Sequence, residues 1–407
     1  MRLTRMLLGV FAAVARWDGI HRLAEANRQG GRKLVAWMLV PGVLSLSAIA
    51  VARAQDRDVK PAAAARAANS PPLVPVRLNV DGNFRIAPPY AADPAFTRKP
   101  DVPQGRVIRF TMNSAESKLF PTAPAGGGAG PGRGRGETTP AVPAEPAQHQ
   151  TFQRQVAVYV PAGYVANTPA PFIVVQDERW FVPEDAPAGP DGKPRTDLPF
   201  MPVMLDNLIH EKRIPAIVAV LLSPGPGGQR TIEYDTVSDR YVNFVETEVL
   251  PRITRDYQVA FTTDPEGRAA FGESSGAAAA LTMAWLHPNL YRRVISYSGT
   301  FVALQRNATA PNGAWDFHQT FVPNSERKPL RIWLHVSEND LGATSPVEQM
   351  RNWVVANTRM AAALKAKGYP HQFVFSEASG HVERSVEMQT MPEAFEWVWK
   401  SYKPGKD

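Results

Sequence analysis

Short apolar runs that alternate with longer amphipathic segments fill the chain from about residue 170 onward. The runs are apolar throughout rather than at every second position, which indicates strands buried on both faces, as in a parallel sheet. Repeated strand–helix alternation favours a doubly wound α/β fold, a mostly parallel sheet with helices on both faces. Pro251 predicts a kink or an early end in one helix. The expected strands lie at 172–175, 214–222, 269–271, 294–297, 330–336 and 373–375, and the expected helices at 202–211, 238–256, 276–287, 347–367 and 385–402.

Two further strands are expected ahead of this region. Residues 105–117 contain apolar side chains among residues that are typical of strands. In residues 153–160, Val alternates with other residues at the period of 2 that is typical of a strand. The segment between them, 121–148, holds six Pro and seven Gly among its 28 residues. This composition predicts a loop insert that joins an antiparallel strand pair. We expect one catalytic domain over 103–405.

The positive charge of the chain is concentrated at its N-terminus. The net charge is +7, but residues 1–54 hold eight basic and two acidic residues, which leaves 37 basic and 36 acidic residues in the rest. A body with a net charge of +1 has no electrostatic footprint for a phosphate backbone, so nucleic acid is not an expected partner.

The N-terminal 54 residues have the order of a secretory signal. An apolar stretch at 34–50 follows Arg28, Arg32 and Lys33 and precedes Ala52-Arg53-Ala54. A basic region, an apolar region and a small-x-small site predict export with cleavage after Ala54, and hence a periplasmic or secreted protein without a membrane span; an uncleaved anchor is the alternative. Residues 55–102, rich in Ala, Pro and Arg, are interpreted as a linker and an extended lead-in.

The chemistry is expected at one strand-to-helix junction. Gly272-Glu273-Ser274-Ser275-Gly276 fits the pattern G-x-S-x-G between an apolar run and a helix of strong helix formers. In this setting a sharp turn exposes the Ser274 hydroxyl at the carboxyl edge of the sheet, and glycines avoid collision with the crossing backbone. The N–H of Ser275 would face a developing oxyanion at the start of the helix.

A serine hydroxyl needs a base that is oriented by a carboxylate. Among the eight histidines, His381 follows a loop of small residues after a late strand and precedes the final helix, which is the expected place for the base. The acid should follow the preceding strand, where both Glu338 and Asp340 qualify. Asp340 is preferred because it lies deeper in the loop and its shorter side chain holds an imidazole more firmly.

These motifs, taken in order, resemble the esterase D or enterochelin-esterase-like family of α/β-hydrolases, which also contains feruloyl esterases and mycolyltransferases. The resemblance runs from about Gly105 to about Tyr402, with the Gly/Pro-rich segment as an insert. It implies an α/β-hydrolase fold. The matching segments are 230–235 (RTIEYD), 248–251 (EVLP), 268–276 (RAAFGESSG), 298–301 (SGTF), 338–341 (ENDL) and 380–381 (GH).

The resemblance also implies roles for individual residues. Ser274 corresponds to the nucleophile, Asp340 to the acid and His381 to the base. The second oxyanion donor would be the N–H of Arg179, in a loop where Glu178 stands at a position that is usually Gly in the family. A side chain at this tight bend is expected to alter the geometry of that donor.

Two further sets of residues are expected beside the site. Arg230 and Glu233 are predicted to form a structural ion pair. Candidates for an acyl or aromatic pocket are Trp180, Trp315, Phe317 and His318, with core or lid packing as the alternative for each.

The sequence therefore predicts an exported serine esterase that acts through an acyl-enzyme on a small-molecule or polysaccharide-linked ester. No cofactor or metal is implied, because HExxH, P-loop and GxGxxG patterns are absent and the chain has no Cys. The open alternatives are a siderophore trilactone hydrolase, a feruloyl or acetyl carbohydrate esterase, an acyltransferase, and a non-catalytic binding protein on the same fold.

Overall fold

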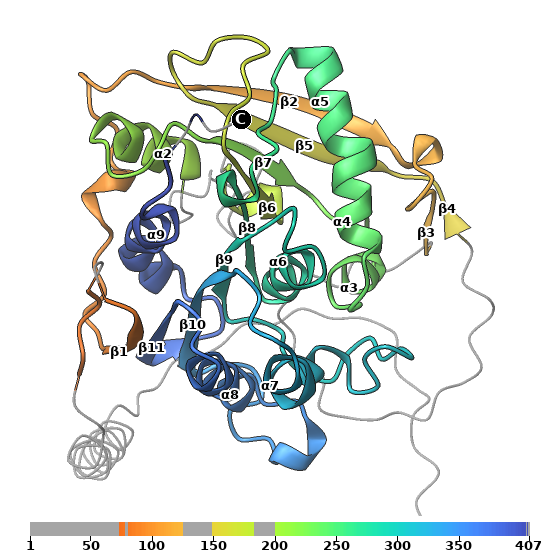
Figure 1. Cartoon of the computed structure of the whole chain (residues 1–407), viewed down its shortest axis with the longest axis vertical. Helices are drawn as coiled ribbons and strands as arrows, with labels where there is room; N and C mark the ends of the chain where they lie inside the picture. Colours follow the sequence, from red (N-terminus) through yellow and green to blue (C-terminus); the bar gives the residue numbers. More distant parts are fainter. Residues whose placement is uncertain (1–72, 78–79, 125–148, 183–199, 404, 406–407) are drawn as a thin grey trace, which may run out of the picture. The chain divides into compact units, whose positions relative to one another are not determined.

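A nine-stranded sheet forms the centre of the unit that contains residues 71–407 (Figure 1). The computed structural model describes residues 73–77, 80–124, 149–182, 200–403 and 405, so the predicted signal at 1–54 and most of the predicted insert lie outside the described residues. In spatial order the strands are β1 (Gly82–Ile86), β11 (His371–Gly380), β10 (Arg331–Asn339), β9 (Arg293–Tyr297), β8 (Arg268–Glu273), β6 (Phe172–Gln176), β7 (Val218–Leu222), β5 (Gln153–Val160) and β2 (Arg106–Asn113).

Seven neighbouring strands, from β1 to β7 in the spatial order, are parallel. β5 is antiparallel to both β7 and β2. The predicted mostly parallel sheet with an N-terminal antiparallel strand pair is therefore confirmed. Two short strands pair with each other, β3 (Ala123–Pro124) near the start of the predicted insert and β4 (His149–Gln150) directly after it.

Helices cover both faces of the sheet, as the apolar strands require (Figure 1). Along β6, Phe172 and Val174 join one buried cluster, whereas Ile173 and Val175 join the other. The first cluster contains side chains of α3 (Gln229–Tyr234), α4 (Arg240–Phe244), α5 (Leu250–Tyr257), α6 (Ser275–Leu286) and α8 (Trp353–Ala366). The second contains side chains of α2 (Met201–His210) and α9 (Arg384–Trp399). A short helix, α7 (Val322–Asn324), precedes β10.

The predicted helix at 238–256 is divided, and its irregular part follows from Pro251. Between α4 and α5 the residues Val245–Val249 form a π-helical turn, in which the N–H of Leu250 donates to the carbonyl of Val245. Pro251 has no N–H with which to continue the regular hydrogen-bond pattern of an α-helix. The N–H of the residue before it therefore donates to the carbonyl five residues earlier instead of four. The helix predicted at 347–367 also begins later, at Trp353, where the Asn352 side chain caps the N–H of Val355.

The segment 55–102, interpreted as a linker and an extended lead-in, contains the strand β1. Phe84 and Ile86 are buried, and β1 pairs in parallel with β11 at the edge of the sheet. The segment after β1 is also fixed, because the Asn207 side-chain amide donates to the carbonyl of Ala95. Two alternating apolar residues were too short a signal to reveal a strand whose partner lies almost 300 residues later in the chain.

A buried ion pair fastens β5 to α3, a helix that the sequence analysis did not predict. The guanidinium of Arg154 donates to both carboxylate oxygens of Glu233, at 2.8 and 2.7 Å, and also to the carbonyl of Ser223 at 2.7 Å. Both side chains are almost fully excluded from solvent. Removal of one partner would leave the other charge buried without compensation.

We expect Arg154→Met to lower the free energy of unfolding by about 3–5 kcal/mol, because it leaves Glu233 unpaired. The double variant Arg154→Met/Glu233→Leu should recover most of that loss. Urea denaturation of the two single variants and the double variant gives the coupling energy. Strictly additive losses would show that the pair contributes no coupling.

Candidate active site

Ser274 lies in a strained turn between β8 and α6. Its backbone has φ 55° and ψ −121°, a conformation that an L-residue rarely adopts. A Cβ on Gly272 would lie 2.1 Å from the carbonyl carbon of Gly276, and one on Gly276 would lie 2.9 Å from the Cβ of Gln176. Gly272 is therefore required by the close approach of the Gly276 backbone, and Gly276 by the close approach of the Gln176 side chain. Ser274 itself is 8% exposed.

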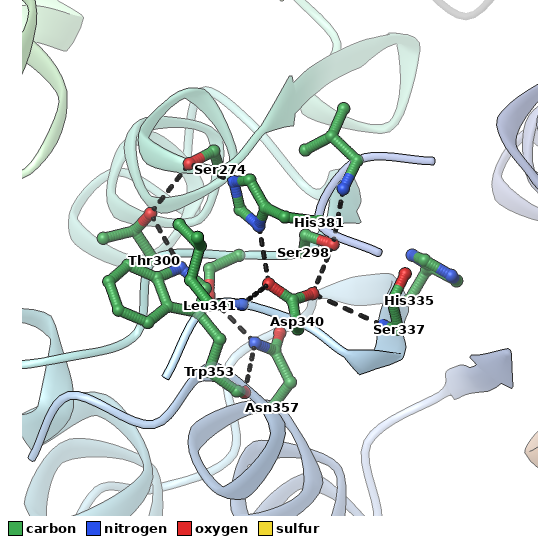
Figure 2. A network of polar contacts seen from close by, with 12 residues as sticks. Ser274, Ser298, Thr300, His335, Ser337, Asp340, Leu341, Trp353, Asn357 and His381 are labelled. Atoms are coloured by element: carbon green, nitrogen blue, oxygen red, sulfur yellow. Dashed lines mark hydrogen bonds and ion pairs between the residues drawn. The ribbon is translucent and has the colours of Figure 1, made fainter. Parts of the chain in front are cut away.

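Ser274, His381 and Asp340 form one chain of hydrogen bonds (Figure 2). Ser274 Oγ lies 3.0 Å from His381 Nε2, and His381 Nδ1 lies 2.5 Å from Asp340 Oδ1. The three residues come from turns that follow β8, β11 and β10, whose carboxyl ends meet at one edge of the parallel sheet. The structure thus brings together the three residues that the sequence analysis singled out.

Asp340 is held by more than the imidazole. Its Oδ2 accepts hydrogen bonds from the Ser298 hydroxyl at 2.6 Å and from the N–H of Ser337 at 3.4 Å, and its Oδ1 accepts from the N–H of Leu341 at 2.7 Å. Burial alone would raise the pKa of Asp340, but the hydrogen bonds from His381, Ser298 and Leu341 hold it below its ordinary value. The carboxylate is therefore ionised at neutral pH.

Glu338, the alternative acid, faces a different partner. Its carboxylate accepts a hydrogen bond from the N–H of Ala378 at 2.8 Å. It makes this bond to the neighbouring strand β11 rather than to the imidazole of His381, whose Nδ1 is occupied by Asp340. The geometry therefore favours Asp340 over Glu338.

A second set of polar contacts surrounds the Ser274 hydroxyl (Figure 2). Thr300 Oγ1 lies 3.3 Å from Ser274 Oγ and accepts a hydrogen bond from the indole of Trp353 at 3.2 Å. The Trp353 ring also meets His381 edge-on, with ring centroids 6.3 Å apart. The backbones of Ser274 and Thr300 are also hydrogen-bonded, because the N–H of Thr300 donates to the carbonyl of Ser274 at 3.0 Å.

The two expected oxyanion donors lie at the starts of helical turns. Ser275 is the first residue of α6, and Arg179 lies in a 3₁₀ turn, η3 (Glu178–Trp180), directly after β6. N–H groups in the first turn of a helix lack a partner within that helix. No residue in the described part of the chain accepts a hydrogen bond from either N–H.

The bend before η3 does not fall on Glu178. The left-handed residue is Asp177, with φ 62° and ψ 51°, whereas Glu178 is not among the residues with positive φ. The Glu178 side chain is buried and accepts a hydrogen bond from the Ser223 hydroxyl at 2.9 Å. A side chain at position 178 thus enters the turn without the strain that a left-handed backbone would impose.

The predicted Arg230–Glu233 ion pair is wrong. Arg230 binds Asp177 through both carboxylate oxygens, at 2.8 and 2.7 Å, and Glu233 binds Arg154 instead. The two residues are three positions apart on α3, but each pairs with a strand or turn across the fold. The spacing in the sequence suggested a partner within the helix, but both side chains form their ion pairs with residues outside it.

A family model described as "Putative esterase" matches residues 150–389 of the chain. The chain belongs to this esterase family. It is a hydrolase that acts on carboxylic esters. A search among curated proteins gives no match.

Some solved structures are similar to this esterase. A ferulic acid esterase is 15% identical, with a TM-score of 0.50, over 74% of this chain and 100% of that chain. The enterochelin esterase from Shigella flexneri is 18% identical, with a TM-score of 0.48, over 74% of this chain and 60% of that chain. The CE1 ferulic acid esterase from the anaerobic fungus Anaeromyces mucronatus is 15% identical, with a TM-score of 0.47, over 76% of this chain and 96% of that chain. The esterase thus spans about three fifths of the length of the enterochelin esterase.

Of the four pocket candidates, Trp180 shares its turn with Arg179, an expected oxyanion donor. It ends the η3 turn and is partly buried, with the guanidinium of Arg179 5.0 Å and that of Arg384 5.6 Å from its ring. Trp315 and Phe317 are buried in the core cluster that contains α6 and α8. None of the hydrogen bonds or ring contacts between described residues joins either of them to Ser274 or His381.

His318 is buried against the edge of Trp315, with ring centroids 4.5 Å apart. Burial lowers the pKa of His318 to about 4, and the charge of Arg359 adds to the effect. The imidazole is therefore neutral at neutral pH. Its Nε2 has no hydrogen-bond partner among the described residues.

The esterase contains site residues that the sequence analysis did not assign. Ser298 and Thr300 lay within a quoted family segment, but their hydrogen bonds to Asp340 and Ser274 could not be read from it. Asp235 accepts a hydrogen bond from the Ser275 hydroxyl at 3.0 Å. Burial raises the pKa of Asp235 to about 7, although the Ser275 hydroxyl and Arg230 act in the opposite direction. Asp235 also lay within a quoted family segment, 230–235, but its burial could not be read from that segment.

The described part of the esterase contains no group of His, Cys, Asp and Glu residues arranged to hold a metal ion. Within the same residues, none of the helices has the length and apolar character needed to cross a bilayer.

We expect Gly272→Ala to lower the free energy of unfolding by about 1–3 kcal/mol or more, since its Cβ meets the backbone of Gly276. Gly228→Ala is the matched control, because that glycine has φ −71° and no atom within 4 Å of an added Cβ. It should change stability by less than about 1 kcal/mol, in the stabilising direction. Urea unfolding of both variants checks this, and equal stability of the two would contradict the required close approach.

Proposed function

We propose that the protein is an exported serine esterase in which Ser274 is the nucleophile, His381 the general base and Asp340 the residue that orients the base. The observation that carries the proposal is the continuous chain of hydrogen bonds from Ser274 Oγ through both ring nitrogens of His381 to Asp340. A serine, a histidine and an ionised carboxylate in this order are recognised as a catalytic triad by their geometry.

In the proposed cycle, His381 Nε2 takes the proton of Ser274 as Oγ attacks the carbonyl carbon of the ester. The tetrahedral intermediate collapses, the C–O bond to the alcohol breaks, and the alcohol leaves with the proton from His381. A water molecule then gives a proton to His381 and attacks the acyl-enzyme, which releases the carboxylic acid and restores Ser274. Asp340 remains ionised throughout and stabilises the imidazolium.

The N–H groups of Ser275 and Arg179 are the proposed donors to the oxyanion. Both lie at starts of helical turns near Ser274 and have no acceptor among the described residues. Such fixed donors stabilise charge that develops only in the transition state. Trp180, one residue after Arg179, is the proposed wall of the acyl pocket. Feruloyl or other aromatic acyl esters and siderophore lactones are the substrate classes to compare, in keeping with the names of the proteins that share the fold.

Ser274→Ala is expected to abolish both turnover of p-nitrophenyl butyrate and covalent labelling by a fluorophosphonate probe, because the attacking oxygen is removed. Ser385→Ala is the control, since that serine is exposed and its Oγ lies 3.4 Å from Glu383. Labelling should persist in the control and map to the peptide that contains Ser274. Turnover by Ser274→Ala at the wild-type rate would refute the proposed nucleophile.

The choice of acid is tested by a matched pair of isosteric variants. Asp340→Asn should lower kcat by roughly 10³–10⁴-fold, because an amide favours the wrong imidazole tautomer. Glu338→Gln should leave kcat within about threefold, since this side chain binds only the Ala378 N–H in the described structure. Steady-state kinetics of both variants on p-nitrophenyl butyrate test this choice. A large loss of kcat in Glu338→Gln and a small one in Asp340→Asn would assign the acid to Glu338.

A further inference from the structure

We propose that Arg230 and Arg384 are positioning residues that clamp the turn from Asp177 to Trp180 onto the Ser274 turn and so hold the oxyanion-binding N–H of Arg179 in place. This inference rests on the proposed function, because it assigns a task to residues around the same site. Neither arginine is a catalytic residue, since each acts through another side chain.

The turn needs an attachment beyond the sheet. β6 and β8 are neighbours, but their last paired residues are Val175 and Phe271. The turn from Asp177 to Trp180 and the residues from Glu273 to Ser275 therefore lie past the end of this ladder. An oxyanion site shared by two such turns depends on side chains to fix their separation.

Arg230 supplies the first attachment. It binds both carboxylate oxygens of Asp177, and its Nη2 lies 3.4 Å from the carbonyl oxygen of Glu273. A guanidinium is suited to this task because its planar fork binds a carboxylate at two points and still has a donor to spare. The Asp177 carboxylate in turn packs against Gly276, where an added Cβ would lie 3.2 Å from Oδ2.

Arg384, the first residue of α9, supplies the second attachment through the side chain of Glu273. Its Nη1 donates to Glu273 Oε1 at 2.5 Å and also to the buried carboxylate of Glu387. Its guanidinium lies 5.6 Å from the centroid of the Trp180 ring. The two arginines thus connect both ends of the turn, Asp177 and Trp180, to Glu273, the residue that precedes Ser274.

The nearby Arg154–Glu233 pair distinguishes positioning from plain structural support. It has the same bidentate geometry as the Arg230–Asp177 pair, it is at least as buried, and Glu233 lies on the same helix as Arg230. Among the described residues, Arg154 donates hydrogen bonds to Glu233 and to the carbonyl of Ser223, and to no residue of the turn from Asp177 to Trp180. The Ser223 hydroxyl that binds Glu178 is a separate group of that residue. Loss of either pair should cost stability, but only loss of the Arg230 pair should loosen the oxyanion site.

The experiment compares Arg230→Gln and Arg384→Gln with the control Arg154→Gln in the full chain, at a temperature below the Tm of each variant. The readouts are kcat and KM for p-nitrophenyl butyrate and the inhibition constant of a trifluoromethyl ketone with the same acyl chain, which forms an oxyanion on the active serine. Removal of a whole oxyanion donor costs about 10²–10³-fold in kcat. A displaced donor should cost about 10–100-fold.

We expect each of the two clamp variants to lower kcat by about 10–100-fold and to raise the inhibition constant of the trifluoromethyl ketone by the same factor. KM should change by less than about threefold. The Arg154→Gln control should have a lower Tm with kcat and inhibition within about threefold of wild type. If Arg230→Gln does not fold, Arg230→Lys and Arg154→Lys replace the glutamine pair, because lysine keeps the charge without the fork.

Equal kcat in the Arg230 and Arg154 variants, or an Arg230 variant that changes only KM, would overturn the clamp. Ser274→Ala, measured alongside, separates this result from failure of the proposed function. If Ser274→Ala is inactive while the Arg230 variant keeps its kcat, the triad stands and the clamp is rejected. If Ser274→Ala retains turnover, the triad itself is rejected.

Discussion

The left-handed turn at Ser274 is the constraint on which the neighbouring structure depends. Its N–H donates to the carbonyl of Tyr297, at the end of β9, and its carbonyl accepts from the N–H of Thr300. The end of β9 and the segment that follows it therefore fix the strained backbone, which would otherwise cost about 1–3 kcal/mol. The glycines at 272 and 276 complete the turn. A Cβ on Gly272 would collide with the backbone of Gly276, and a Cβ on Gly276 would collide with the Gln176 side chain at the end of β6. The position of the serine hydroxyl is thus set by its surroundings before any substrate binds.

Much of this structure could be predicted because its signals are local. The strands over 153–160 and 172–175, the serine turn and the histidine after the last strand each follow from a few consecutive residues and the order of elements. The edge strand β1 and the helix α3 were missed for a common reason. Both are short, and β1 gains its stability from pairing with β11, far away in the chain. Propensity within a window of five or six residues carries little information about such elements.

Partner choice among charged side chains was the least predictable feature of the site. Sequence spacing suggested Arg230 with Glu233, but the two side chains pair with Asp177 and Arg154, which come from the strand or turn opposite each of them. The same difficulty applied to the acid. Glu338 and Asp340 are two residues apart, and only the arrangement of β10 beside β11 separates a carboxylate that binds a backbone N–H from one that meets an imidazole.

The pairing of β1 with β11 has a consequence for the solubility of the molecule. β11 carries at its end the loop of His381, and without β1 its backbone N–H and C=O groups would form an open edge. Exposed edges of apolar strands are templates for association between chains. Residues 82–86, with Arg85 bound to Glu377 of β11, therefore serve as a protective border that keeps the histidine-bearing strand from pairing with a second molecule. A chain cut back to residue 103 would keep Ser274, Asp340 and His381 and yet be prone to aggregate.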